Sequence, residues 1–192
     1  MLLAGIATAG FIVFRKSETR IGTADFSFLH NGDLILRRGR TVESFAVYTL
    51  DRKHNYSHIG IVAYENHIPY IIHVVPDRPG IVMKELPADF LSKKNASQYR
   101  ILRSDFNTSE LERVAGNAFD FYKRKLVFDD RYDLATDREL YCSELILKAF
   151  ENSNICLSGI RPQKVSLLVG VYYVIMPGVF IENSHFTTVR AG

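Results

Sequence analysis

Apolar positions recur with two different periods along this chain, and the change of period separates expected strands from expected helices. Residues 56–64 and 69–75 are short, apolar-rich stretches on either side of a polar turn at 65–67, which predicts a hairpin. Further strands are expected at the short apolar runs 34–36, 81–84, 99–103 and 186–189. The longer apolar run 165–176 fits either a strand or a helix.

Helical spacing is clearest over residues 107–126, where Asn107 or Thr108 can cap the first turn. Its apolar stripe comprises Leu111, Val114, Ala115, Ala118, Phe119 and Tyr122. A second amphipathic helix is predicted over 143–151. A third is predicted over 41–53, capped by Thr41 and with one apolar face. That face comprises Val42, Phe45, Ala46 and Leu50. One helical turn is expected at 87–91 and a short helix at Pro177.

Hairpin-linked strands with helices set apart from them favour the α+β class, an antiparallel sheet packed against helices. With 192 residues the chain suits one domain, which we place at 20–192. The 47% hydrophobic and 23% charged residues exclude a disordered chain and a polytopic membrane protein. A net charge of +3 is too small an excess to indicate a nucleic-acid partner. The oligomeric state is left open.

The segment 1–19 is treated separately, because residues 1–14 carry no charged side chain and Arg15 and Lys16 follow at once. The run is shorter than the roughly 20 apolar residues of a spanning helix. Three interpretations remain open: a signal or membrane anchor, a core helix, or an apolar tail. The first would associate the protein with a membrane and place it in the cell envelope, outside the cytoplasm.

Sequence motifs for cofactors and metals are absent. There is no GxGxxG after a strand, no GxxxxGK[ST], no HExxH, no CxxC and no GxSxG. His54 and His58 are four residues apart but have no third ligand nearby in the sequence. We therefore expect no cofactor and no metal.

The more informative of the two cysteines is Cys142, which stands where a polar loop meets the predicted helix 143–151. A sulfur at a helix N-terminus is near backbone N–H groups and the positive end of the helix dipole, which favour thiolate. The alternative is a small, buried, structural cysteine. Cys156 has no such setting and is interpreted as structural.

A thiolate nucleophile needs an imidazole base and a group that orients it. Two of the six histidines lie on the neighbouring strands of the predicted hairpin, His58 at the start of one and His73 within the other. Alternation places His58, Gly60 and Val62 on one face of the first strand. Gly60 leaves room beside His58 for another element, such as a helix end. His73 needs a hydrogen-bond partner within its apolar strand, and it also fits a satisfied core histidine.

Three blocks resemble a known family: 32–35 (GDLI), 56–62 (YSHIGIV) and 141–145 (YCSEL). In this order and spacing they resemble the YiiX/YebB-like family of circularly permuted, papain-like cysteine hydrolases. Those proteins are relatives of the NlpC-type amidases and of lecithin:retinol acyltransferase. The resemblance is clearest over residues 31–150. It implies a permuted papain-like fold with the nucleophile at a helix N-terminus and with thiol-protease-like chemistry.

By this resemblance Cys142 matches the nucleophile and His58 the general base, and His73 takes the third position. Glu is the residue expected there in many YiiX-like proteins, so His73 departs from the pattern and supplies less negative charge. Tyr56, two residues before His58, is a candidate to hold the oxyanion or bind substrate, together with the backbone N–H of Cys142. The acidic loop that precedes Cys142 either borders the cleft or is simply solvated.

The expected function is a thiol hydrolase or amidase that cleaves an amide, such as that of a cell-wall peptide, through a Cys142 thioester. Two alternatives remain. One is a lipid acyl hydrolase or acyltransferase of the same fold, because His73 and its strand resemble the acyltransferase relatives. The other is a non-catalytic envelope protein that binds a ligand. The substrate is therefore either peptide-like or lipid-like.

Overall fold

The computed structural model describes residues 25–51, 53–76, 80–167 and 170–192. The predictions for segment 1–19, and for the start of the domain at residue 20, lie outside these residues. Within the described parts of the chain, no helix combines the length and the apolar character needed to cross a bilayer.

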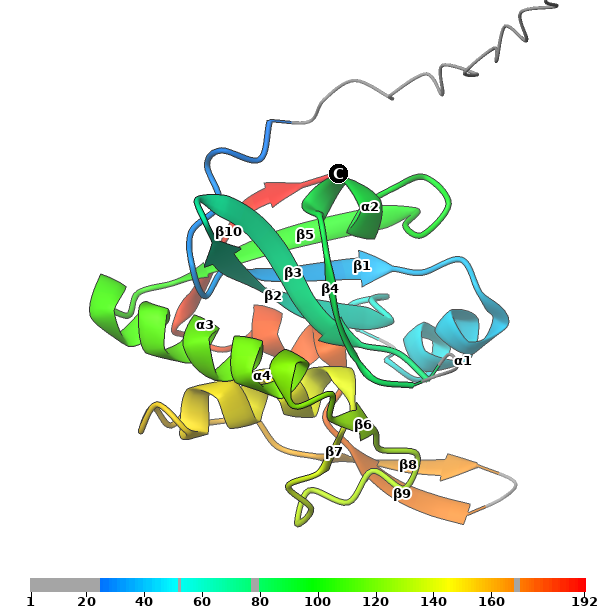
Figure 1. The fold of residues 1–192 in the computed structure, drawn as a ribbon. Coiled ribbons are helices and arrows are strands. Elements are labelled where there is room, and N and C mark those ends of the chain that lie inside the picture. The colour runs from blue at the N-terminus through cyan, green and yellow to red at the C-terminus, as the bar shows by residue number, and fades with distance from the viewer. Residues whose placement is uncertain (1–24, 52, 77–79, 168–169) are drawn as a thin grey trace, which may run out of the picture.

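A six-stranded antiparallel sheet organises the fold, in the order β10-β5-β1-β2-β3-β4 (Figure 1). The strands are β1 (Leu34–Arg38), β2 (His58–Glu65), β3 (Ile68–Val74), β4 (Val82–Glu85), β5 (Gln98–Ser104) and β10 (Phe186–Ala191). Each of them matches a strand expected from the sequence to within a few residues. The β2–β3 pair is the predicted hairpin, with Ile61 opposite Ile72 and Glu65 opposite Ile68.

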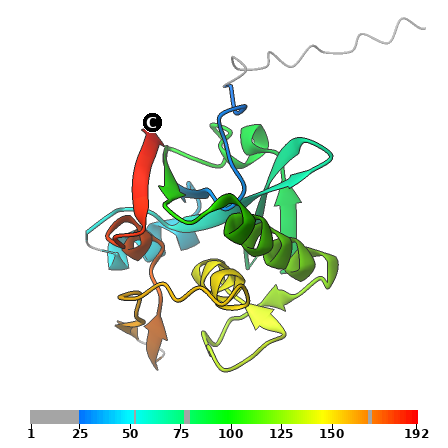
Figure 2. The ribbon, with the colours of Figure 1, turned by 90° about the vertical axis from the view of Figure 1, so that its left-hand side faces the viewer.

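Two helices cover one face of the sheet, α3 (Thr108–Lys123) and α4 (Cys142–Glu151). They lie side by side against β2 in both views of the ribbon (Figures 1 and 2). The larger apolar core fills this layer, with Ile59 and Ile61 of β2 pointing into it. Asn107 caps α3 by accepting the N–H of Glu110, as its position in the sequence predicts. The antiparallel sheet packed on helices confirms the predicted α+β class.

The opposite face of the sheet carries a smaller apolar cluster under α2 (Pro87–Phe90), which is the helical turn expected at 87–91. Val62 and Ile71 point into this cluster, and Phe90 closes it. The rings of His58 and His73 pack on Phe90, with centroids 5.6 and 5.0 Å away. The predicted alternation of β2 is therefore confirmed, and it places both histidines on the α2 face.

The Gly32-Asp33 pair has a structural role at the start of β1. Gly32 has φ +81°, and a Cβ there would meet Leu111 at 2.7 Å, so the position requires glycine. The buried carboxylate of Asp33 accepts two hydrogen bonds from Arg103, at 2.9 and 2.7 Å, and the N–H of His30. This bidentate ion pair ties the start of β1 to β5.

Helix α1 (Val42–Leu50) forms where expected, and Thr41 caps it by accepting the N–H of Ser44. Its apolar face nevertheless does not join the core: Val42 is 82% exposed and Phe45 is 59% exposed. Helical spacing therefore predicted the element correctly. Periodicity shows that apolar residues share a face, but it does not show that another element covers that face.

Five further short elements lie outside the six-stranded sheet in the described residues. The ambiguous run 165–176 lies mostly in a hairpin of β8 (Gln163–Leu167) and β9 (Gly170–Val174). The short helix expected at Pro177 is a 3-10 helix, Pro177–Ile181. A parallel pair of two-residue strands, β6 (Val127–Phe128) and β7 (Glu139–Leu140), was not predicted, because strands this short carry no readable period. The pair brackets the polar loop 129–138.

Candidate active site

Cys142 is the first residue of α4, and Tyr141 before it is extended, with φ −97° and ψ 170°. Glu144 helps to begin the helix here, because its carboxylate accepts the N–H of Tyr141 at 3.3 Å. The thiol lies near its own backbone N–H and those of Ser143 and Ile59, and hydrogen bonds from these groups favour thiolate. Since Ile59 directly follows His58, α4 delivers the nucleophile to the first residues of β2.

The two histidines form a hydrogen-bonded pair, with His58 Nε2 2.9 Å from His73 Nδ1. Both rings are buried, and they meet edge to face with centroids 5.0 Å apart. The space beside Gly60 is filled by β3 rather than by a helix end. A Cβ on Gly60 would meet the Ile71 side chain at 2.5 Å and His73 Cβ at 3.2 Å. Glycine at this position lets β3 bring His73 close to His58.

Glu85 extends the pair to a third side chain that sequence reasoning missed. Its Oε2 lies 3.3 Å from His73 Nε2. The two atoms lie within ion-pair distance, although neither has an aligned hydrogen-bond partner among the described residues. In the β3–β4 register Glu85 stands opposite Ile71, which makes it a diagonal neighbour of His73 on the same face. The predicted strand 81–84 ended one residue short of it.

Charge at Glu85 fixes the proton positions along this chain of side chains. Interaction with His73 lowers the pKa of Glu85, so the carboxylate is ionised near neutral pH. An ionised Glu85 favours the tautomer with the His73 proton on Nε2, in which His73 Nδ1 accepts the hydrogen bond from His58 Nε2–H. This tautomer leaves His58 Nδ1 with a free lone pair, and no hydrogen-bond partner for that nitrogen occurs in the described part of the chain.

Burial sets the resting charge of the site. It lowers the pKa of His58 well below its ordinary value, and Arg37 and His73 act in the same direction. It also lowers the pKa of His73, against the opposing effect of Glu85. For Cys142 burial raises the thiol pKa and outweighs the nearby N–H groups. The N–H groups at the helix N-terminus favour thiolate, as expected, but burial acts more strongly in the opposite direction. The directions of the two pKa shifts favour a neutral thiol and a neutral imidazole at rest.

We therefore expect Cys142 to react slowly with iodoacetamide near pH 6 and to accelerate only above the ordinary thiol range, roughly pH 8.5. Mass spectrometry of peptides alkylated across a pH series measures this. The exposed Cys156 provides an internal reference in the same molecule. Rapid alkylation at pH 6 that disappears in a His58→Ala variant would instead show a resting thiolate–imidazolium pair.

Tyr56 is buried, and its hydroxyl accepts a hydrogen bond from Arg100 Nε at 3.3 Å. It lines a pocket of ≈ 530 Å³ whose wall includes Lys53, His54 and Arg100. The structure thus directs this hydroxyl toward β5. Its candidate role at the oxyanion stays a prediction.

A different tyrosine, Tyr132 of the loop 129–138, packs on the residue that precedes the nucleophile. Burial raises the pKa of Tyr132, and negative charge on Cys142 raises it in the same direction. Its ring packs edge to face on Tyr141 and Tyr172, at centroid distances of 5.2 and 5.9 Å. Its backbone has φ +57°, which costs about 1–3 kcal/mol for a residue other than glycine. No motif marked this residue in the sequence.

The aspartates of this loop do not act alike. Asp129 is fully buried, and its carboxylate accepts the N–H groups of Arg131 at 2.9 Å and Asp133 at 2.6 Å. These bonds hold the turn that carries Tyr132. Asp137 is exposed and lies 3.2 Å from Lys148 Nζ. Asp129 therefore shapes the loop and is not a charge offered to solvent.

Residues 28–172 match the model of a protein family described as the permuted papain-like amidase enzymes, YaeF/YiiX, C92 family. The chain belongs to this family. Its members are papain-like amidases, so the chain is a cysteine hydrolase at the family level, as the resemblance implied. No curated protein matches the chain.

A solved structure supports the permuted papain-like fold. The YiiX protein from Escherichia coli O157:H7, described as a metalloprotein, superimposes with a TM-score of 0.70 over 85% of this chain and 97% of its own, at 18% sequence identity. Among the described residues of the present chain, no three His, Cys, Asp or Glu side chains are placed to hold a metal ion.

Proposed function

We propose that this YiiX-like hydrolase cleaves a peptide amide, such as one in a cell-wall peptide, through a thioester on Cys142. The observation that carries the proposal is the connected chain from Glu85 through His73 to His58, together with a Cys142 thiol at a helix N-terminus that lies near the N–H of Ile59, the residue after His58. Cys142 and His58 are its catalytic residues, and His73 and Glu85 are positioning residues that act through His58.

The chemistry begins with a neutral pair. His58 Nδ1 accepts the proton of Cys142 Sγ as the sulfur bonds to the substrate carbonyl carbon, and the carbonyl electron pair moves onto oxygen. The backbone N–H of Cys142 has no acceptor within the helix, so it is available to the oxyanion. Collapse breaks the C–N bond, and the leaving amine takes the proton from His58. Water then attacks the thioester carbon while His58 accepts its proton. The C–S bond breaks, the carboxylic acid leaves, and His58 returns the proton to the Cys142 sulfur.

Replacing the expected Glu at the third position by His73 does not remove negative charge from the site. The negative charge is supplied instead by Glu85, whose carboxylate lies 3.3 Å from His73 on the side away from His58. The imidazolium that forms on His58 is then stabilised by a neutral His73 that Glu85 polarises. This arrangement supplies the orienting charge for amide cleavage.

The substrate class is tested with two probes, a muropeptide mixture and vesicles of phosphatidylglycerol and phosphatidylethanolamine. We expect wild-type protein to release new amino groups from the muropeptides and no fatty acid from the vesicles, with Cys142→Ala inactive on both. Release of fatty acid, or a fatty acyl adduct on Cys142 by intact-protein mass spectrometry, contradicts the peptide substrate and favours the lipid alternative. Association with a membrane through residues 1–14, in the cell envelope, stays a prediction.

A further inference from the structure

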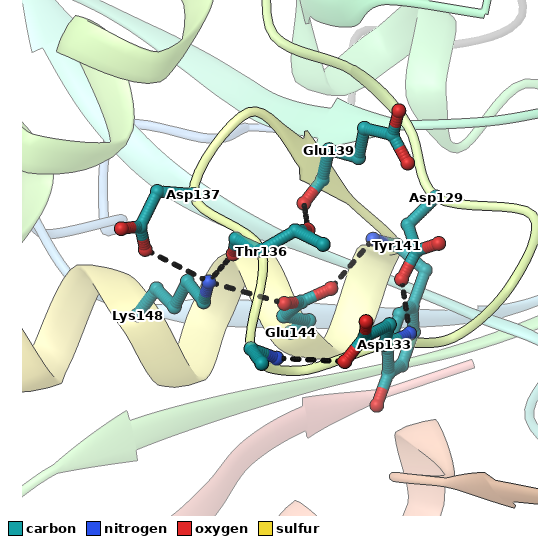
Figure 3. A network of polar contacts seen from close by, with 9 residues as sticks. Asp129, Asp133, Thr136, Asp137, Glu139, Tyr141, Glu144 and Lys148 are labelled. Atoms are coloured by element: carbon teal, nitrogen blue, oxygen red, sulfur yellow. Dashed lines mark hydrogen bonds and ion pairs between the residues drawn. The ribbon is translucent and has the colours of Figure 1, made fainter.

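Lys148 joins the loop before Cys142 to the helix that begins with it (Figure 3). Its ammonium donates a hydrogen bond to the carbonyl of Thr136 and lies 3.2 Å from a carboxylate oxygen of Asp137. On its own helix it lies 3.4 Å from Glu144 Oε1, one turn away. The Lys148 side chain is only 14% exposed, so most of it is withdrawn from water to make these contacts.

Glu144 is the buried partner in this group, and the proposed mechanism does not use it. It is fully buried, with Oε2 on the N–H of Tyr141 and Oε1 facing Lys148 (Figure 3). Burial raises its pKa to about 7, while Lys148 and the Tyr141 N–H oppose the rise. The Lys148 ammonium stabilises the ionised form of this buried carboxyl, and the 3.4 Å contact holds Lys148 against its own helix.

The loop is thereby fixed at two points. At its start Asp129 accepts the N–H groups of Arg131 and Asp133, on either side of Tyr132. Toward its end Lys148 binds the carbonyl of Thr136. Tyr132 lies between these points in a left-handed conformation that an unrestrained tyrosine rarely adopts. Such a conformation persists only where the surroundings enforce it.

We propose that Lys148, held by Glu144, is a positioning residue that restrains the loop 129–138, so that the ring of Tyr132 stays packed on Tyr141, the residue directly before Cys142. This role rests on the proposed function, in which Cys142 is the nucleophile. It gives the loop that precedes Cys142 a fixed geometry. Lys148 itself does not contact the reacting atoms. Its effect on Cys142 passes through the loop and through Tyr132.

The rate of Cys142 alkylation by iodoacetamide, relative to Cys156, tests this without any substrate. In a Lys148→Met variant we expect the ratio to rise about tenfold, because a loop that is no longer restrained leaves its place against Tyr141 and exposes the neighbouring Cys142. Lys148→Arg should stay near the wild-type ratio, since arginine can also bind the Thr136 carbonyl. Lys164→Met, at an exposed lysine of β8, is the matched control and should not change the ratio.

If Lys148 acts by positioning Tyr132, and not by a general loosening of the loop, the effect of Lys148→Met on the alkylation ratio should depend on Tyr132. Tyr132→Gly removes the ring at a φ that glycine accepts, and it should raise the alkylation ratio by itself. Adding Lys148→Met to Tyr132→Gly should then change little. An unchanged ratio in Lys148→Met, or effects of the two substitutions that multiply, would overturn the proposal.

A double variant controls for misfolding of Lys148→Met. Lys148→Met alone leaves Glu144 buried without its cation, so the double variant Lys148→Met/Glu144→Gln removes both charges and should show the same raised ratio. If the alkylation pattern appears as expected but the wild-type protein hydrolyses no amide, the positioning role stands and the proposed function fails. If hydrolysis is found and the pattern is absent, the positioning role fails alone.

Discussion

Replacing Cys142 by alanine is expected to abolish amide cleavage while the protein still folds. The side chain is the only proposed nucleophile, and loss of a member of such a catalytic group lowers kcat by roughly 10⁴-fold or more. Cys142 is half-buried at the first position of α4, where alanine fits without strain. Circular dichroism and thermal unfolding should therefore match wild type, and steady-state assays on the muropeptide probe measure the loss.

Cys156→Ser is the matched control, since it removes the other free thiol at an exposed position. It should retain wild-type turnover. His58→Ala should approach the Cys142→Ala loss, because His58 is the proposed base that accepts the thiol proton. The double variant should be no worse than either single one, since the two groups act as a unit. Retention of full activity in Cys142→Ala would show that the nucleophile lies elsewhere.

The acid limb of the pH profile adds to this test. His58 must be neutral to act as a base, and burial lowers its pKa well below the ordinary value of about 6.5. Activity should therefore persist below pH 6.5 and be lost only as the pH falls through the lowered value.

The sequence predicted the parts of the site that lie in local patterns. Cys142 stands at a boundary between a polar loop and an amphipathic helix, and His58 and His73 lie on two strands joined by a short turn. Each of these signals is local, so a single chain suffices to find it. The same holds for the sheet, whose strands are short apolar runs between turns.

Glu85 could not be found in the same way. It comes near His73 only through the register of β3 against β4, which pairs residues 71 and 85, and no local period encodes a cross-strand register. Tyr132 was missed because the loop that carries it is shaped by one buried carboxylate, Asp129. The resting charge of Cys142 could not be predicted either, because it depends on burial by the whole fold as well as on the local N–H groups.

Glu85→Gln tests whether this second carboxyl position orients the base. Glutamine keeps the shape, and its amide oxygen can still accept the His73 Nε2 proton, but the negative charge is lost. The His58 imidazolium then forms without the polarising carboxylate, so we expect kcat to fall roughly 10- to 100-fold with KM nearly unchanged. Glu65→Gln, at a carboxylate of β2 paired with Lys84, is the control and should leave kcat unchanged.

A double-mutant cycle decides whether Glu85 acts through His73. His73→Ala should reduce turnover less completely than His58→Ala, because His58 keeps its lone pair but loses its orienting partner. In that background Glu85→Gln should have almost no further effect, since the carboxylate reaches His58 only by way of the His73 ring. A kcat for Glu85→Gln within twofold of wild type, or a full additional loss in the His73→Ala background, would show that the carboxylate does not orient His58. The neutral resting state of Cys142 and His58 would then depend on burial alone.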